Sequence, residues 1–248
     1  MRRANIGRIR RGELSMSEAC PRGPVRQGAS RRFEESTAPR RNDRVAPPSQ
    51  CRFCDGEPEL VELSSTAIPD VKLVRLRRFQ DARGYFFETW NSDKFRAAGL
   101  AVDFVQDNQA GSAAVGTMRG LHYQTAPYAQ GKLIGVIRGS IFDVAVDIRR
   151  GSPTFGRSIG VTLTAADPAR LWVPAGFAHG YVTLEPDTEV VYKVTSGYAP
   201  QAEGGIRWDD PALGIDWPID PAGMTVNDRD RDWPRLADAP AHFEYGAA

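Results

Sequence analysis

The sequence has little cysteine and histidine and no long apolar run. All three cysteines precede residue 59, so neither a disulfide nor a thiol can serve the rest of the chain, and a reducing cytoplasm is the expected location. No stretch approaches the roughly 18 apolar residues of a membrane-spanning helix. No apolar run of about 7–15 residues follows the first arginines, which argues against a secretory signal. We therefore expect a cytoplasmic protein with no membrane partner.

Lysine is absent from the first 58 residues, which hold 13 arginines against 7 acidic residues. The rest of the chain holds 19 basic and 24 acidic residues, so the formal net charge of +1 averages two unlike parts and does not indicate a nucleic-acid partner. The first part is rich in Arg, Pro, Ser and Gly, and its apolar residues follow neither a helical nor a strand period. This predicts a disordered extension over residues 1–60, unless it is translated upstream sequence and the true start lies near Val61.

Cys51 and Cys54 have the spacing of half a zinc site or of a redox pair. Neither a second such pair nor a pair of histidines accompanies them, and Cys20 stands alone. A transit peptide would be poor in acidic residues, which this extension is not. We therefore expect no metal here and no targeting role.

Short strands separated by turn residues dominate from Ile68 onward. In the segment from Ser140 to Arg150, apolar and polar residues alternate with the strand period of two. Turns rich in Gly, Pro and Asp separate such segments at intervals near ten residues, which is typical of an antiparallel sandwich or barrel. The other predicted strands are Val71–Leu76, Thr117–Tyr123, Lys132–Ile137, Ser158–Leu163, Arg170–Val173, Phe177–Leu184 and Thr188–Thr195.

A single early helix is predicted near residues 94–98, where Asn91 and its neighbours offer N-caps and Gly99 ends the helical pattern. Residues 227–236 fit either a short helix or a loop. These patterns predict an all-β, double-stranded β-helix (jelly-roll, cupin-like) over residues 61–240, with few short helices and a C-terminal tail at 241–248.

Four residues within the predicted strands could carry chemistry. His122 and His179 invite a metal site, but such a site needs a close histidine pair, and Gln124 occupies the position two after His122. A lone strand histidine is more often a hydrogen-bonded core residue. Lys132 and Tyr192 are costly inside a barrel unless they are used, although Tyr192 could be plain core and Lys132 could reach outward.

Several motifs together resemble one enzyme family. They are RGLHYQ, QGKL, GSIFDVAVDIR, SPTFG, LWVPAGFAHGY, VVYKVT and IRWDDPALGIDWP. In this order, between about Ile68 and Leu236, they are similar to the dTDP-4-dehydrorhamnose 3,5-epimerase family. The resemblance implies a metal-free jelly-roll of the cupin class, usually a homodimer, that needs no cofactor and acts on a nucleotide-linked 4-keto-6-deoxy sugar.

The resemblance also implies roles. His122 matches the general base and Asp230 its partner, Tyr192 matches the acid on the opposite face of the sugar, and Lys132 matches the cation beside the C4 oxygen. The implied substrate-binding residues hold the diphosphate (Arg83, Arg119, Arg229), line the pocket (Gln106, Asn108, His179, Tyr198) or contact the base across the partner subunit (Phe86, Glu88). This chain differs from the family pattern at Asn227, at Arg229, and at Gly135, where a larger residue is usual.

Two alternatives remain open beside an isomerase. One is a metal-dependent cupin oxygenase, which the missing histidine pair disfavours. The other is a non-catalytic module that binds a sugar nucleotide, against which the complete set of His122, Asp230, Tyr192 and Lys132 argues.

Overall fold

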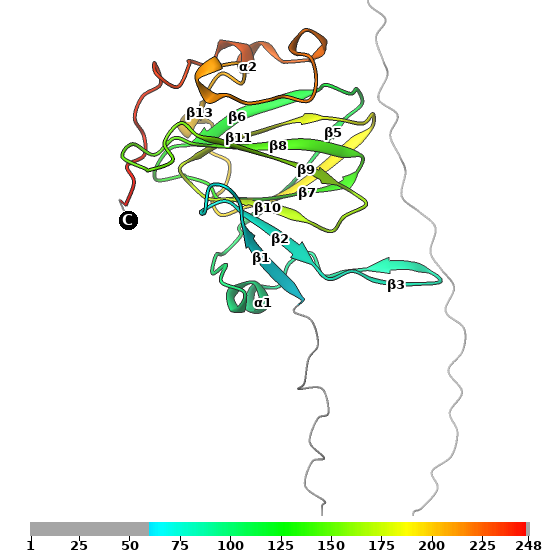
Figure 1. The fold of residues 1–248 in the computed structure, drawn as a ribbon. Helices are drawn as coiled ribbons and strands as arrows, with labels where there is room; N and C mark the ends of the chain where they lie inside the picture. The colour runs from blue at the N-terminus through cyan, green and yellow to red at the C-terminus, as the bar shows by residue number, and fades with distance from the viewer. Residues whose placement is uncertain (1–59, 247–248) are drawn as a thin grey trace, which may run out of the picture. The chain divides into compact units, whose positions relative to one another are not determined.

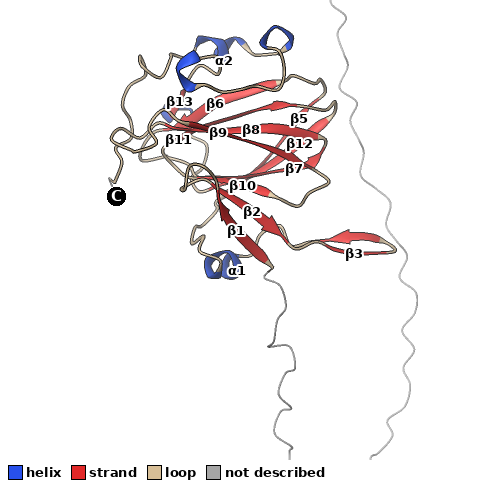
Figure 2. Cartoon of the chain, viewed as in Figure 1, coloured by secondary structure: helices blue, strands red, loops and turns tan. Residues whose placement is uncertain are grey.

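The computed structural model describes residues 60–246 (Figures 1 and 2). Residues 1–59 of the predicted N-terminal extension, with the three cysteines, lie outside the described residues, as do the last two residues of the predicted C-terminal tail. Among residues 60–246, no helix is long and apolar enough to cross a membrane.

Two antiparallel sheets form the body of the described part. The first, called the larger sheet, has the order β1-β2-β10-β7-β12-β5, and the second, called the smaller sheet, has the order β13-β6-β11-β8-β9. The strands of the larger sheet are β1 (Val61–Ser65), β2 (Lys72–Leu76), β10 (Arg170–Val173), β7 (Lys132–Arg138), β12 (Thr188–Val194) and β5 (Gln106–Ser112). Those of the smaller sheet are β13 (Glu203–Gly205), β6 (Met118–Gln124), β11 (Phe177–Thr183), β8 (Ser140–Asp147) and β9 (Ser158–Thr164). This confirms the predicted jelly-roll fold class.

The core has three layers because both sheets bury both faces over part of their area. Between the sheets, Ile134 and Leu171 of the larger sheet pack with Ala145 and Phe177 of the smaller one. The outer face of the smaller sheet is covered by the C-terminal segment, which contributes residues such as Leu213. Figure 1 shows this segment, in orange and red, lying over β6 and β11.

Helix α1 (Ser92–Ala97) covers part of the outer face of the larger sheet. Asn91 caps it by accepting a hydrogen bond from the Lys94 N–H at 3.2 Å, and Gly99 follows it with φ of 100°. Its Phe95 is fully buried in a cluster with Trp172 of β10. The predicted early helix is therefore confirmed, although it begins two residues before Lys94. In the segment that fitted a helix or a loop, α2 (Asp228–Asp232) forms a short helix.

A hairpin made of β3 (Phe79–Asp81) and β4 (Gly84–Phe86) extends away from the sandwich (Figure 1). Gly84 has φ of 129° in the tight connection. The hairpin leaves large apolar side chains in solvent: Phe79 is 46%, Tyr85 60% and Phe86 70% exposed. Exposed aromatic residues on a projecting element are typical of an interaction surface.

Candidate active site

Two adjoining cavities of about 280 Å³ each lie between the sheets. Both are lined by His122, Lys132, Tyr192, Tyr198 and Glu203, so we treat them as one pocket. One cavity adds Arg119, His179, Arg229 and Asp230, and the other adds Gln106 and Asn108. The structure therefore brings together ten of the thirteen residues that the sequence indicated for the site.

A bulge in β6 determines which of its residues face the pocket. The pairing runs from His179 with His122 to Tyr181 with Arg119, so Gly120 and Leu121 together lie opposite the single residue Gly180. Strict strand alternation along MRGLHYQ predicts that Met118, Gly120, His122 and Gln124 share one face, and the bulge shows that this prediction is wrong. Met118 is buried in the cluster on the outer face, whereas the extra residue turns both Arg119 and His122 into the pocket.

His122 and Asp230 form a hydrogen-bonded pair with 2.7 Å between Nε2 and Oδ1. Asp230 is fully buried at the start of α2, where its N–H donates to the side chain of Asn227 at 2.7 Å. Its second oxygen accepts the Gly120 N–H at 3.1 Å. Burial alone would raise the pKa of Asp230, but the bonds from His122 and Gly120 outweigh it and lower that pKa. An ionised Asp230 only accepts hydrogen bonds, so the proton of a neutral His122 lies on Nε2, and Nδ1 is the nitrogen that can take a proton.

Lys132 and Tyr192 come from the opposite sheet. Lys132 opens β7 and donates from Nζ to the carbonyl oxygen of His122 at 3.3 Å. Burial lowers the pKa of Lys132 to about 8, against the charges of Asp143 and Glu203. Burial raises the pKa of Tyr192 on β12, while Arg119 opposes this. The pocket thus holds the His122–Asp230 pair on one wall and a cation and a phenol on the other.

A second histidine–carboxylate pair lies beside the first. His179 Nε2 is 2.7 Å from Asp143 Oδ1, and Asp143 is fully buried. Burial lowers the pKa of His179 although Asp143 opposes this, so the imidazole is neutral. The other Asp143 oxygen and the buried Tyr181 hydroxyl have no hydrogen-bond partner in the described part of the chain. Sequence reasoning placed His179 in the pocket but missed Asp143 and Tyr181.

Glu203 is a further pocket residue that sequence reasoning missed. It accepts hydrogen bonds from Arg229 Nη1 at 2.8 Å and from the Tyr198 hydroxyl at 3.1 Å. Gln106 also contacts Tyr198, since its Oε1 accepts the Tyr198 N–H at 3.1 Å. The sequence did offer a signal for Glu203, because this residue stands three positions before the IRWDDP motif.

The remaining three predicted site residues do not reach the pocket of their own chain. Arg83 and Phe86 lie on the projecting hairpin, where Arg83 pairs with Asp81. Glu88 follows the hairpin and accepts a hydrogen bond from Lys94 Nζ at 2.6 Å.

The fold and the pocket define a class of enzyme: a jelly-roll of the cupin type that carries acid–base groups on two facing walls. Among residues 60–246, no group of three or more His, Cys, Asp or Glu side chains is arranged to hold a metal ion. The oxygenase alternative therefore has no candidate ligand set in this part of the chain.

Comparison with known proteins identifies the family. The family model for dTDP-4-dehydrorhamnose 3,5-epimerase matches residues 65–238, so the chain belongs to this family of isomerases. A dTDP-4-dehydrorhamnose 3,5-epimerase of Sinorhizobium fredii is 47% identical over 192 residues, which cover 77% of this chain and 98% of that protein.

Two solved structures are similar in fold and sequence. The dTDP-6-deoxy-D-glucose-3,5-epimerase of Legionella pneumophila, in complex with dTDP-4-keto-L-rhamnose, has a TM-score of 0.72 and 38% identity, covering 75% of this chain and 100% of that one. A 3'-monoepimerase of Streptomyces bikiniensis, in complex with dTDP-quinovose, has a TM-score of 0.65 and 36% identity, covering 70% of this chain and 87% of that one. The chain is thus similar both to a protein named for two epimerised positions and to one named for a single position.

Proposed function

We propose that the protein epimerises a dTDP-4-keto-6-deoxyhexose at C3, C5 or both, by removing and returning a proton next to the C4 ketone. One observation carries this proposal. His122, paired with Asp230 of α2, comes from the smaller sheet, Lys132 and Tyr192 come from the larger sheet, and all four side chains line the same pocket. Inversion of a carbon requires proton removal on one face and proton return on the other, which this arrangement provides.

His122 removes the proton. Its Nδ1 accepts the proton from the carbon while Nε2 stays bonded to Asp230, whose negative charge stabilises the imidazolium. The electron pair of the broken C–H bond moves into the enolate, whose oxygen lies against the Lys132 ammonium. Positioned acid–base groups of this kind contribute about 10²–10⁴-fold each to the rate.

Tyr192 returns a proton to the same carbon from the opposite face. Its raised pKa keeps the phenol protonated at neutral pH, so it can donate. Arg119 and Arg229 supply positive charge at the pocket for the diphosphate of the substrate, and the neutral His179 donates or accepts hydrogen bonds at the sugar. Arg229 is held by Glu203 until the diphosphate competes for it.

We also propose a homodimer in which the hairpin of one subunit completes the pocket of the other. Arg83 and Phe86 match the family's substrate contacts, yet they lie on an exposed hairpin away from their own pocket. A second copy would give these side chains a pocket to enter and would cover their apolar surface.

The experiment is proton NMR of dTDP-4-keto-6-deoxyglucose incubated with the protein in D₂O. Deuterium at both C3 and C5 supports double epimerisation, and deuterium at one position supports the narrower reaction. No deuterium at either position would refute the proposal and would favour a non-catalytic binding module.

Two variants assign the roles of the two walls. His122→Ala should abolish exchange, whereas His242→Ala, which removes an exposed histidine outside the pocket, should not. Tyr192→Phe should leave proton removal, and so some exchange, while inversion is lost because the second proton donor is gone. Tyr128→Phe removes a hydroxyl from a 41% exposed tyrosine and serves as its control.

A further inference from the structure

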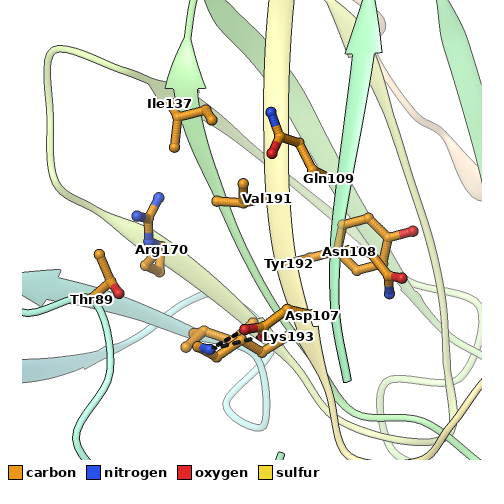
Figure 3. A pocket seen from close by; sticks show the side chains of 10 residues that line it. Thr89, Asp107, Asn108, Gln109, Ile137, Arg170, Val191, Tyr192 and Lys193 are labelled. Carbon is orange, nitrogen blue, oxygen red and sulfur yellow. Dashed lines mark hydrogen bonds and ion pairs between the residues drawn. The ribbon is translucent and has the colours of Figure 1, made fainter. Parts of the chain in front are cut away.

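A second cavity lies on the opposite side of the larger sheet, on its outer face (Figure 3). Its volume is about 470 Å³. The outward-facing side chains of β12, Val191 and Lys193, form its floor, and Ile137 of β7 and Gln109 of β5 stand beside them. Asn108 and Tyr192 line both this cavity and the active-site pocket. Strand alternation directs the side chains of Val191, Lys193 and Gln109 to the outer face, so most of this cavity lies on the side of the sheet away from that pocket.

Arg170 of β10 is the buried charge in this cavity, with only 4% of its surface exposed. The pairing of Leu171 with Ile134, continued by one residue, sets Arg170 opposite Gly135. The guanidinium lies across that glycine, so that a methyl group at position 135 would coincide with its Nη1 nitrogen. Arg170 therefore fills the space that a side chain at position 135 would occupy. The family pattern has a larger residue at this position.

The two acidic side chains near this cavity already accept hydrogen bonds from residues other than Arg170. Asp107 receives two hydrogen bonds from Lys193 Nζ, at 2.8 and 2.9 Å, which Figure 3 draws as dashed lines. Glu189 accepts a hydrogen bond from Gln109 at 2.8 Å.

The Arg170 guanidinium donates no hydrogen bond to any residue of the described part of the chain. Its one charged or aromatic contact there is the ring of Phe87, whose centre is 5.8 Å away. Burial without a nearby carboxylate lowers its pKa. The guanidinium therefore faces the cavity from a largely buried side chain with no acceptor from the described residues, which is an arrangement suited to binding an anion there.

We propose that Gly135 and Arg170 together form an oxyanion-binding site on the outer face of the larger sheet, which takes a carboxylate or a phosphate group. A guanidinium binds either group through paired N–H donors. The oxyanion comes either from a free anion or from an acidic side chain of a second copy of this chain. The site faces away from the catalytic pocket, and its test does not depend on epimerase activity.

The test compares wild type with Arg170→Met in two measurements. Thermal unfolding is followed in inorganic phosphate and in chloride at equal ionic strength, and the dissociation constant of self-association is measured by analytical ultracentrifugation. If the oxyanion is free, phosphate raises the Tm of wild type but not that of Arg170→Met. If it belongs to a second copy, Arg170→Met weakens self-association by about tenfold or more.

Lys193→Met is the matched control. It removes a positive charge from the same cavity, but this charge is already paired with Asp107. It should change neither readout to the extent that Arg170→Met does. If Arg170→Met and Lys193→Met behave alike, or if Arg170→Met changes nothing, the proposal is wrong.

A second pair of variants tests the geometry. Gly135→Ala should lower the Tm, because the new methyl group displaces the guanidinium. Adding Arg170→Ala to Gly135→Ala should restore part of the loss, since the small side chain frees the space. A Gly135→Ala protein as stable as wild type would show that Arg170 does not occupy this position.

Discussion

Burial acts on Lys132 and Tyr192 in opposite directions on the pKa scale, because it favours the neutral form of each. It lowers the pKa of Lys132 to about 8 and raises that of Tyr192 above its usual value of 10. Lys132 is thus the group that loses its proton first as the pH rises. The phenol keeps its proton throughout the range in which the ammonium titrates.

This order predicts the alkaline side of the pH profile. The proposed role of Lys132 requires a positive charge, so kcat/KM should fall above about pH 8, approaching tenfold per pH unit. Steady-state kinetics with the dTDP-4-keto sugar between about pH 6 and 10 measures this, because kcat/KM reports ionisations of the free enzyme.

Lys132→Arg tests the assignment. A guanidinium stays charged at every pH in this range, so the variant, whatever its absolute rate, should lose the decline near pH 8. An unchanged decline in Lys132→Arg, or a flat wild-type profile up to about pH 10, would contradict the role of Lys132.

Motif resemblance was the main source of the site prediction at this scale. Asp230 is 108 residues from His122 in sequence, and no local spacing could pair them. Asp143 shares its alternating strand with Asp147, and nothing in the sequence marks either one as the partner of His179. Contacts between segments distant in sequence created both pairs, β6 with α2 in one case and the neighbouring strands β11 and β8 in the other, so only a family pattern or the fold itself could reveal them.

At the scale of the element, the bulge in β6 sets the phase of the catalytic strand. Gly120 has φ of 131°, and a methyl group there would lie 2.5 Å from the Gly180 Cα and 2.9 Å from the His179 carbonyl oxygen. Only glycine accepts both the backbone conformation and the close approach. The glycine therefore fixes the positions of Arg119 and His122 in the pocket.

Gly120→Ala should destabilise the protein by about 2–4 kcal/mol, because it combines backbone strain with contact against the neighbouring strand. Exchange activity should fall with it, since relief of the clash must move β6. Gly111→Ala, on β5 with nothing within 4 Å of the new methyl group, should change stability by less than about 1 kcal/mol. Urea unfolding of both variants measures the difference, and equal values would contradict this account of the bulge.

The alternation rule predicted strands well where one face is apolar. The predicted Arg170–Val173 is found with the same bounds, and Lys132–Ile137 is one residue longer at its end. Strand β5, with the sequence QDNQAGS, was missed because its polar residues serve the pocket on one side and the outer cavity on the other. The bulge was missed because its cause is Gly180, 60 residues away in sequence.

At the scale of the whole molecule, one chain supplies an incomplete site. Its pocket carries the acid–base groups, and its hairpin carries Arg83 and Phe86 outside that pocket. If the hairpin acts in the partner's pocket, each dimer contains two sites, and each site is built from both chains. A defect in the pocket and a defect in the hairpin would then complement each other when they lie on different subunits.

A purified heterodimer tests this arrangement. One subunit carries His122→Ala, and the other carries Arg83→Ala with Phe86→Ala. Neither homodimer should be active, but the heterodimer has one site with an intact pocket and an intact hairpin, so about half of the wild-type activity should return. A hairpin that served its own pocket would leave both sites defective and the heterodimer inactive. A heterodimer of His122→Ala with Lys132→Met is the control, because both of its pockets are defective whichever chain supplies the hairpin. Deuterium exchange measured on separately tagged, co-purified subunits therefore decides whether the hairpin works in its own chain or in its partner.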